Sequence, residues 1–519
     1  MREAGGVWQV PARREPSLIG PRVFRFLNVD GSLDEVGWDG PLREKLWRYN
    51  QYYFDDLNAE DAASRSVWHA GLIEDWLAGN PPARGSGWEP YPTSLRIVNW
   101  IKWHRSGHRL SPEALHSLAI QARWLRQRLE IHLLGNHLFA NAKALVFAGL
   151  FFEGAEADAW LEQGLRILRR EIPEQILPDG GQFERSPMYH ALALEDMLDL
   201  INLMRCHEVE LAAGGQCGGT AGWPALAERM LDWLGVMSHT DGEIGLFNDA
   251  AIGIAPRPAD LAAYAGRLGL KRLEVFDDAG NSGSASVNCR ELRDSGYIRL
   301  ESADAVALLD VGPVGPDYLP GHAHADTLSF ECSIFGRRVI VNGGTSRYGG
   351  GKEFTDRRLF ERSTCNHSTV EIAGESSSEV WGSFRVARRA YPVDLEVRSE
   401  PTVVSVACSH DGYRRLPGQP THRRVWRLVA RRFLVEDRVS SEYPSLARFI
   451  LHPEVRVDRQ GADRLVLRVG EGGCVNLHVI EGRLSLEPVH YACRFGVLRE
   501  TLCVEVALIS GRSAVSLEW

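Results

Sequence analysis

Two adjacent stretches, PEALHSLAIQARWLRQRLEIHLL (112–134) and NHLFANAKALVFAGLFF (136–152), decide how the first half of the chain folds. Both carry apolar residues at three- and four-residue spacing, the pattern of a helix with one buried face. Gly135 stands between them, where a glycine commonly ends a helix. Together the two stretches predict a helical hairpin.

Further stretches with the same spacing lie before and after this hairpin. They cover residues 62–79, 93–107, 157–176, 191–209, 223–240 and 259–269. Connections rich in Gly and Pro join them, and no strand pattern intervenes. Helices of similar length joined by short loops predict hairpins stacked in a ring or partial ring over residues 1–280.

The second half of the chain has a different pattern. From YIRLESADAVALLDVGP (297–313) onward, short β-branched runs such as VDLEVRS (393–399) alternate with turns. Short strands with few intervening helices predict an antiparallel β-sandwich over residues 281–519. The predicted fold class is therefore α+β with two domains, helical first and sandwich second.

Composition excludes several classes of protein. Of 519 residues, 44% are hydrophobic and 24% charged, which is ordinary for a globular enzyme and excludes disorder, collagen and small disulfide scaffolds. No apolar run is long enough to span a membrane, so we expect no membrane insertion. The nine cysteines, an odd number without a CxxC pair, predict buried free thiols. Residues 1–20 lack an apolar leader, so we expect a cytoplasmic protein, or a periplasmic or secreted one whose leader was removed.

The net charge and the absence of three catalytic motifs disfavour several classes of function. The net charge of −9 argues against a nucleic-acid partner. Residues 337–424 are locally basic, with 15 Lys and Arg against 10 Asp and Glu, which suits either a specific anion or a solvated sheet face. The GxSxG, GxxxxGK[ST] and HExxH motifs are absent from the sequence, which disfavours serine hydrolases, nucleotide hydrolases and zinc proteases.

Two clusters in the helical half carry candidate chemistry. Asn136 can cap the helix that it begins, and His137 then projects from the first turn, where an amide and an imidazole suit a carboxylate. The second cluster, ERSPMYH (184–190), places Arg185, Tyr189 and His190 at a helix start. There Arg185 is expected to lower the pKa of the Tyr189 phenol and to hold substrate. The alternatives are that Asn136 merely caps its helix and that Tyr189 is a core tyrosine.

A third cluster, GHAHAD (321–326), enters a predicted strand. Residues two apart in a strand face the same side, so His322 and His324 are expected to address one site. Asn342 and His367 follow further along the chain. Imidazoles with an oxygen donor favour zinc or a similar divalent ion, with satisfied structural histidines as the alternative.

These clusters, in this order, resemble the heparinase II/III family of polysaccharide lyases and the related alginate lyases. The resemblance also covers LWRYNQYYFDDL (46–57), FNDAA (247–251), CNHSTVEIAG (365–374) and HDGYRRLPGQPTHRRVW (410–426). It implies an incomplete (α/α) toroid followed by an antiparallel β-sandwich. It also implies β-elimination on an acidic polysaccharide, a glycosaminoglycan such as hyaluronan, chondroitin sulfate or heparan sulfate, that gives 4,5-unsaturated products.

The resemblance also assigns roles to residues. Asn136, helped by His137, would bind the uronate carboxylate; Tyr189 would be base, acid or both; His322 would be the second proton-transfer or neutralising group. His324, Asn342 and His367 would hold a structural zinc or manganese ion, although the family usually has Asp where this chain has Asn342. The residues assigned to substrate binding are Arg96, Arg185, His190, Tyr348 and Arg362. The alternatives are an alginate or exopolysaccharide lyase, a glycoside hydrolase on a toroid, or a protein that binds acidic polysaccharide without cleaving it.

Overall fold

The computed structural model describes residues 1–209, 222–271, 286–349 and 352–519, with side chains omitted for residues 352–355. The chain divides into two compact units. The first comprises residues 1–180, 191–232 and 253–272; the second comprises residues 181–190, 233–252 and 273–519. The predicted domain boundary at 280/281 lies outside the described residues.

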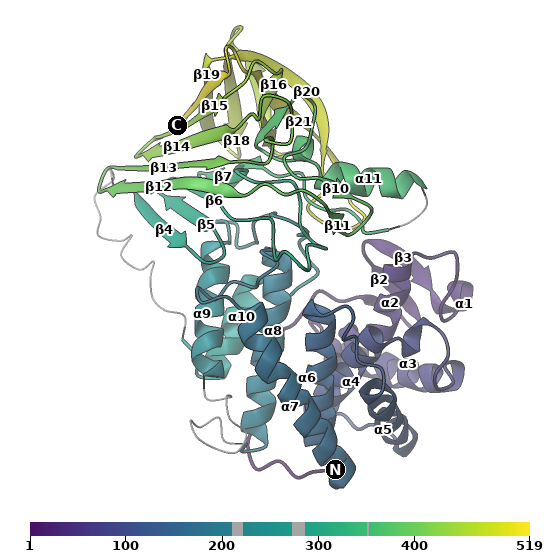
Figure 1. Cartoon of the computed structure of the whole chain (residues 1–519). Coiled ribbons are helices and arrows are strands. Elements are labelled where there is room, and N and C mark those ends of the chain that lie inside the picture. Colours follow the sequence, from purple (N-terminus) through teal and green to yellow (C-terminus); the bar gives the residue numbers. More distant parts are fainter. Residues whose placement is uncertain (210–221, 272–285, 350–351) are drawn as a thin grey trace. The chain divides into compact units, whose positions relative to one another are not determined.

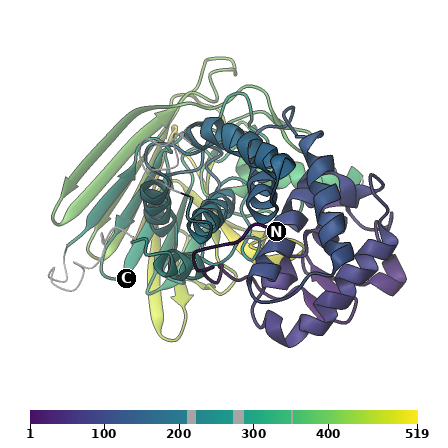
Figure 2. The ribbon, with the colours of Figure 1, turned by 90° about the horizontal axis from the view of Figure 1, so that it is seen from below.

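The first unit is built from helices, as predicted (Figure 1 and Figure 2). Those lying wholly or mainly in it are α1 (Leu33–Val36), α2 (Lys45–Tyr53), α3 (Ser66–Gly79), α4 (Pro90–Arg105), α5 (Pro112–Arg126), α6 (Gly135–Phe151), α7 (Ala155–Gln175), α8 (Pro187–Cys206), α9 (Trp223–Val236) and α10 (Pro258–Arg267). A small antiparallel sheet, β1 (Leu18–Gly20), β2 (Val23–Phe26) and β3 (Val29–Ser32), precedes them. The first turn of α8 and the end of α9 belong to the second unit.

Helix α5 is shorter than predicted. It ends at Arg126 rather than at residue 134, and α6 begins at Gly135. The intervening loop is held by side chains: Asn141 Oδ1 accepts a hydrogen bond from the Glu130 backbone N–H (2.8 Å), and Asn141 Nδ2 donates to the Glu130 carboxylate (3.0 Å). The first bond satisfies the Glu130 N–H from outside the helix, and the second holds the Glu130 side chain, so the apolar periodicity of residues 127–134 does not extend the helix.

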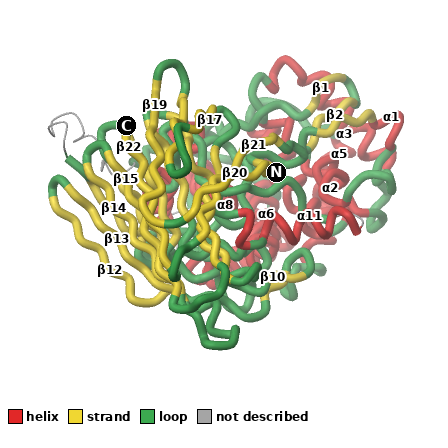
Figure 3. The backbone as a smooth tube through the Cα atoms, turned by 90° about the horizontal axis from the view of Figure 1, so that it is seen from above, coloured by secondary structure: helices red, strands yellow, loops and turns green. Residues whose placement is uncertain are grey.

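The second unit is an antiparallel β-sandwich. One sheet has the order β12 (Pro392–Glu400), β13 (Val403–His410), β14 (His422–Val429), β15 (Arg432–Val439), β22 (Arg512–Glu518), β19 (Gly473–Glu481), β18 (Arg464–Val469), β17 (Arg456–Arg459). The other has the order β20 (Arg483–Tyr491), β21 (Arg499–Ala507), β16 (Ser445–Leu451), β8 (Arg337–Val341), β7 (Phe330–Ile334), β6 (Ala305–Asp310), β5 (Tyr297–Glu301), β4 (Asn288–Leu292), with β9 (Val370–Ile372) on β16. Figure 3 shows β12 to β15 side by side.

The sandwich core lies between the inward faces of these two sheets. Trp426 of β14, Phe433 of β15, Phe330 of β7 and Phe449 of β16 belong to one buried cluster. Burial alternates along β14 and β15, as in strands with one face on a core, whereas β6 and β7 are buried throughout. A short hairpin, β10 (Val380–Trp381) with β11 (Arg385–Val386), follows α11 (Lys352–Arg362).

The predicted class, a helical toroid followed by an antiparallel sandwich, is confirmed. Within the described part of the chain, no helix is both long and apolar enough to cross a membrane. The eight cysteines in those residues are free, as predicted, but only four of them are buried: Cys206, Cys332, Cys408 and Cys503. Cys217 lies outside the described residues.

Candidate active site

The segment Gly321–Asp326 is a loop between β6 and β7, not the extended strand entry that the sequence predicted. A second loop, Phe247–Asp249, holds it in place. Asn248 Oδ1 accepts a hydrogen bond from the His324 backbone N–H (3.0 Å), and the Asp326 carboxylate accepts one from the Asn248 backbone N–H (3.0 Å). The two loops therefore fix each other through main-chain groups.

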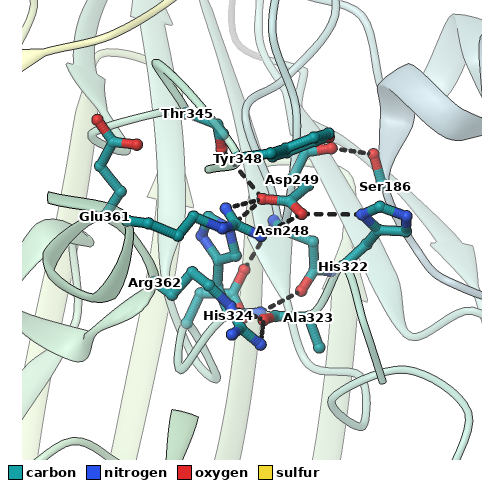
Figure 4. A network of polar contacts seen from close by, with 12 residues as sticks. Ser186, Asn248, Asp249, His322, Ala323, His324, Thr345, Tyr348, Glu361 and Arg362 are labelled. Carbon is teal, nitrogen blue, oxygen red and sulfur yellow. Dashed lines mark hydrogen bonds and ion pairs between the residues drawn. The ribbon is translucent and has the colours of Figure 1, made fainter. Parts of the chain in front are cut away.

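The carboxylate of Asp249 lies at the centre of this arrangement (Figure 4). Oδ2 contacts His322 Nδ1 at 2.9 Å, and Oδ1 contacts His324 Nε2 at 2.8 Å. The guanidinium of Arg358 in α11 pairs with both oxygens, and Arg358, like Asp249, is fully buried. His322 and His324 do address one site, as predicted, and that site is a carboxylate.

Asp249 is ionised in this setting. Burial by itself would raise its pKa, but the Arg358 charge and the contacts of His322 and His324 bring the pKa of Asp249 well below its usual value. An ionised carboxylate can only accept hydrogen bonds, so His322 Nδ1 and His324 Nε2 both carry protons. In a neutral His322 the other ring nitrogen, Nε2, then has the free lone pair.

Tyr189 lies in the first turn of α8. Ser186 caps this helix: its hydroxyl accepts a hydrogen bond from the Tyr189 backbone N–H (3.2 Å) and donates to the backbone carbonyl of Asp249. The Tyr189 ring faces the His322 ring, with centroids 4.0 Å apart, and its hydroxyl lies 3.0 Å from that of Tyr348. A phenol, an imidazole and a second phenol therefore meet at one place in the second unit.

The expected effect of Arg185 on Tyr189 is wrong. The pKa of Tyr189 is raised well above its usual value, because the phenol is buried and lies near Tyr348 and Asp249. Arg185 instead donates to backbone carbonyls of Ser295 (2.9 Å) and Phe183 (3.3 Å). Tyr189 is therefore a neutral phenol, able to donate a proton.

The residues predicted to bind substrate have different positions. Tyr348 lies beside Tyr189, as described. Arg362 donates to the backbone carbonyls of Ala323 and Gly382, and the His190 ring packs on Trp233 with centroids 4.1 Å apart. Both side chains are buried, so they support the loops around the site.

Arg96 in the first unit is fully buried, which does not favour a role in substrate binding. Its guanidinium lies 4.1 Å from the centroid of the Trp76 ring, and it donates to Gln121 Oε1 (2.9 Å). Burial lowers its pKa to about 9. Arg96 contributes to the packing of the helical core.

Asn136 and His137 lie at the start of α6, in the first unit. Helix α6 begins at Gly135, so the prediction that Asn136 caps it is wrong; the capping position is Leu134, whose φ is 57°. His137 does project from the first turn, with Nδ1 3.1 Å from Glu130 Oε1 and its ring 4.5 Å from that of Tyr91. Both residues are half-buried. The convergence of Asn136 with Tyr189 and His322 stays a prediction.

Two of the predicted metal ligands, His324 and His367, face each other. His324 Nδ1 lies 3.1 Å from His367 Nε2, and His367 Nδ1 lies 2.8 Å from the Ser363 carbonyl oxygen. The other nitrogen of His324, Nε2, contacts Asp249. Each of these three contacts needs one proton, but two neutral imidazoles carry only two N–H protons between them. Burial lowers the pKa of His324 to about 3 and also lowers that of His367, which disfavours an extra proton. A cation between the facing nitrogens fits this donor set, since metal-bound histidines direct their other N–H to a carboxylate or carbonyl.

The third predicted ligand fits less well. Asn342 Oδ1 accepts a hydrogen bond from the Ser368 backbone N–H (3.0 Å), and Nδ2 donates to Ser329 (3.3 Å). Among the described residues, no group of three His, Cys, Asp or Glu is arranged to hold a metal ion. A neutral amide adds no charge, so any ion here is held mainly by two imidazoles.

Sequence reasoning missed the roles of Asp249 and Arg358. Neither residue stands among the predicted catalytic, substrate-binding or metal-binding residues. The signal for Asp249 was present in FNDAA (247–251), a short motif in which an amide and a carboxylate follow a buried phenylalanine. Arg358 offered no local signal, because its role depends on a partner 109 residues away.

Two family models match the chain. One, described as Heparinase II/III N-terminus, matches residues 49–254; the other, described as Heparinase II/III-like, C-terminal, matches residues 286–517. Together they cover both units.

Curated relatives include heparin-sulfate lyases and a protein with a different name, and a solved structure shares the fold. Heparin-sulfate lyases of Bacteroides stercoris and Pedobacter heparinus are 26% and 28% identical over 59% and 66% of this chain. The chain spans about half the length of these two relatives, 48% and 53%. FtsZ-localized protein C of Caulobacter vibrioides is 26% identical over 88% of this chain and 78% of its own. A crystal structure of heparinase III has a TM-score of 0.70 at 18% identity, covering 90% of this chain and 76% of its own, which shows a shared fold.

Proposed function

Because the chain belongs to the heparinase II/III-like family, we propose that it is a polysaccharide lyase that cleaves a glycosaminoglycan by β-elimination. The observation that carries this proposal is the Tyr189 phenol stacked on the His322 imidazole, with centroids 4.0 Å apart. One of these groups can accept the C5 proton and the other can donate a proton to O4, the two transfers that an elimination needs.

The elimination needs three tasks. The C5 proton next to the uronate carboxylate must leave, the carboxylate must be neutralised as charge develops, and the departing O4 must gain a proton. His322 Nε2 accepts the C5 proton, and the C5–H electron pair forms the C4–C5 double bond as the C4–O4 bond breaks. Tyr189 donates its proton to O4.

The two groups then exchange a proton to return to their starting states. Tyr348, hydrogen-bonded to Tyr189 at 3.0 Å, stabilises the phenolate that forms transiently. Asn136 and His137, at the start of α6 in the first unit, are the residues proposed to neutralise the substrate carboxylate.

Heparan sulfate is the proposed substrate within the glycosaminoglycans. The named activity of the two heparin-sulfate lyases supports it. Hyaluronan, chondroitin sulfate and alginate are the competing substrates.

We also propose that His324 and His367 hold a divalent ion, zinc or manganese, between two loops of the second unit. Their facing nitrogens and the N–H acceptors Asp249 and Ser363 support it. When bound, the ion would supply a fixed positive charge that pins the two loops together. The elimination steps themselves use only Tyr189, His322 and the groups that hold them.

The test is a substrate panel with two readouts. Heparan sulfate, hyaluronan, chondroitin sulfate and alginate are each mixed with the protein, and near-ultraviolet absorbance and reducing ends are followed together. A lyase raises the absorbance, because its product contains a C4–C5 double bond. It also raises the number of reducing ends, because each broken C4–O4 bond releases one. Tyr189→Phe is expected to abolish the absorbance, whereas Tyr443→Phe, a half-buried tyrosine of the sandwich, keeps it.

Other outcomes would replace the proposal. Reducing ends without absorbance indicate a hydrolase. Binding of an acidic glycan without either signal, unchanged in Tyr189→Phe, indicates a non-catalytic polysaccharide-binding protein.

A further inference from the structure

The buried carboxylate of Asp249 does more than neutralise Arg358. It divides its two oxygens between two histidines, Oδ2 to His322 and Oδ1 to His324, while Arg358 pairs with both. Thr345 adds a longer contact to Oδ1 (3.4 Å) (Figure 4). Every group in this set except His322 is fully or almost fully buried; the His322 side chain keeps 14% of its surface exposed.

The consequence for His322 is a fixed ring and a fixed tautomer. A carboxylate held by a bidentate arginine accepts hydrogen bonds and donates none. The contact at Nδ1 therefore keeps the proton on Nδ1 and leaves the Nε2 lone pair on the opposite edge of the ring. The same contact holds the ring against Tyr189, since the Ser186 cap ties the start of α8 to the Asp249 backbone.

The sandwich contains a second set of the same residue types, which serves as an internal comparison. Asp437 pairs with Arg424 (2.7 Å) and contacts His422 Nε2 (2.8 Å), and His422 Nδ1 lies 3.2 Å from His410 Nε2. This series of hydrogen bonds ends at His410 Nδ1, which accepts a hydrogen bond from the Gly412 backbone N–H (3.2 Å). All four side chains are buried, and they join strands β13, β14 and β15. Arg424 also donates to the backbone carbonyls of Leu328 (2.9 Å) and Ser368 (2.8 Å).

The two sets differ in one contact. Asp437 contacts one histidine, which leads to a second buried histidine. Asp249 does the same through His324, but it also contacts His322, which is partly exposed beside the Tyr189 phenol. This additional contact is unnecessary for joining segments, because the Asp437 set joins strands without it.

We propose that Asp249 is a positioning residue for the elimination: it holds His322 as the Nδ1–H tautomer, with Nε2 available to the substrate, and Arg358 keeps Asp249 in place. This inference rests on the proposed function, in which His322 accepts the C5 proton. Asp249 itself touches neither the substrate nor the reacting atoms.

The first experiment measures the lyase rate of Asp249→Asn. An amide can donate to Nδ1, so it stabilises the opposite tautomer without changing the size of the side chain. We expect kcat to fall by about 10³-fold while KM changes by less than roughly threefold, as when a catalytic imidazole loses its orienting carboxylate. Asp437→Asn is the matched control: it also breaks a buried Asp–Arg–His set, and it is expected to lose stability but keep kcat in conditions where it stays folded.

The second experiment reads the tautomer directly and needs no activity. Nitrogen NMR of isotope-labelled histidine, with His322 assigned by comparison with His322→Gln, is expected to show Nδ1–H and a bare Nε2 in the unmodified protein. Asp249→Asn is expected to shift His322 to the Nε2–H form, and Asp437→Asn to leave it unchanged.

The outcomes separate the two proposals. An Nε2–H tautomer in the unmodified protein, or an Asp249→Asn variant with full kcat, overturns the positioning role while the lyase assignment stands. A protein with no lyase activity but the expected tautomer overturns the proposed function and leaves the role of Asp249 in orienting His322. If Asp249→Asn does not fold, the spectrum of the unmodified protein and the kcat of Arg358→Lys, expected to be reduced, still decide the question.

Discussion

At the scale of single residues, the proposed elimination depends on how Tyr189 and His322 are each held. The Tyr189 phenol is buried and neutral, and the His322 ring is held by an ionised carboxylate at Nδ1. Each side chain is an ordinary one, and its surroundings decide whether it gives or takes a proton.

The Tyr348 hydroxyl is expected to assist Tyr189 rather than replace it. Removing it in Tyr348→Phe costs one hydrogen bond to the charged phenolate, about 1.5–3 kcal/mol, which corresponds to a fall in kcat of roughly tenfold to a hundredfold. Steady-state kinetics on the preferred substrate measure this. Complete loss of activity in Tyr348→Phe, equal to that in Tyr189→Phe, would instead make Tyr348 a proton-transfer group.

The neutral amide at position 342 is expected to weaken metal binding. Asn342→Asp adds a negative charge near His324 and His367, so bound zinc or manganese after dialysis is expected to increase relative to the unmodified protein. Elemental analysis and the shift of the thermal midpoint on adding a chelator both report it. His367→Ala serves as the control that loses the ion; equal metal content in all three proteins would argue against the site.

At the scale of elements, the contact between α6 and α7 depends on two glycines. A Cβ atom at Gly164 would lie 2.7 Å from the Ala142 carbonyl oxygen, and one at Gly149 would lie 2.6 Å from the Leu161 backbone nitrogen. Both distances are shorter than van der Waals contact, so a side chain at either position forces the helices apart.

Gly164→Ala is therefore expected to destabilise the protein by about 1–3 kcal/mol, the usual cost of overpacking. Gly71→Ala is the matched control, because Gly71 lies in α3 with open space around it, and alanine there gains up to about 1 kcal/mol of helix propensity. Denaturant unfolding of the two variants should shift the midpoint in opposite directions. Equal shifts would contradict the close approach of α6 and α7.

At the scale of the whole molecule, buried ion pairs link stability to pH. Burial alone would raise the pKa of Asp437, but Arg424 and His422 bring it far below the usual value. A carboxyl group with a lowered pKa in the folded state contributes stability above its unfolded pKa of about 4, and that stability is lost as the pH falls toward the folded value.

Asp437→Asn is expected to lower the free energy of unfolding at neutral pH by about 3–5 kcal/mol, because Arg424 stays buried without its partner charge. The difference from the unmodified protein should shrink as the pH falls below about 4. Unfolding free energies measured across that range test the sign, and a difference independent of pH would show that the loss is not electrostatic.

Much of the fold was readable from the sequence. Three- and four-residue spacing located α4, α6 and α7, and β-branched runs located β6 and β14, because these patterns depend on neighbours along the chain. The end of α5 was misjudged because the loop after it is held by Asn141, a residue in the next helix. Arg96 was misjudged because nothing in its own stretch reveals the buried face of Trp76.

The sequence by itself determined the class of each half of the chain, the family resemblance and the candidacy of Tyr189 and His322 for proton transfer, but not the β1–β3 sheet or α11. Only the tertiary structure decided that Asp249 joins His322, 73 residues away, to Arg358, 109 residues away. The physical reason is range: helix and strand periodicity is set by contacts a few residues apart, whereas a buried charge takes its partners from whichever segments the packed core brings within hydrogen-bond distance.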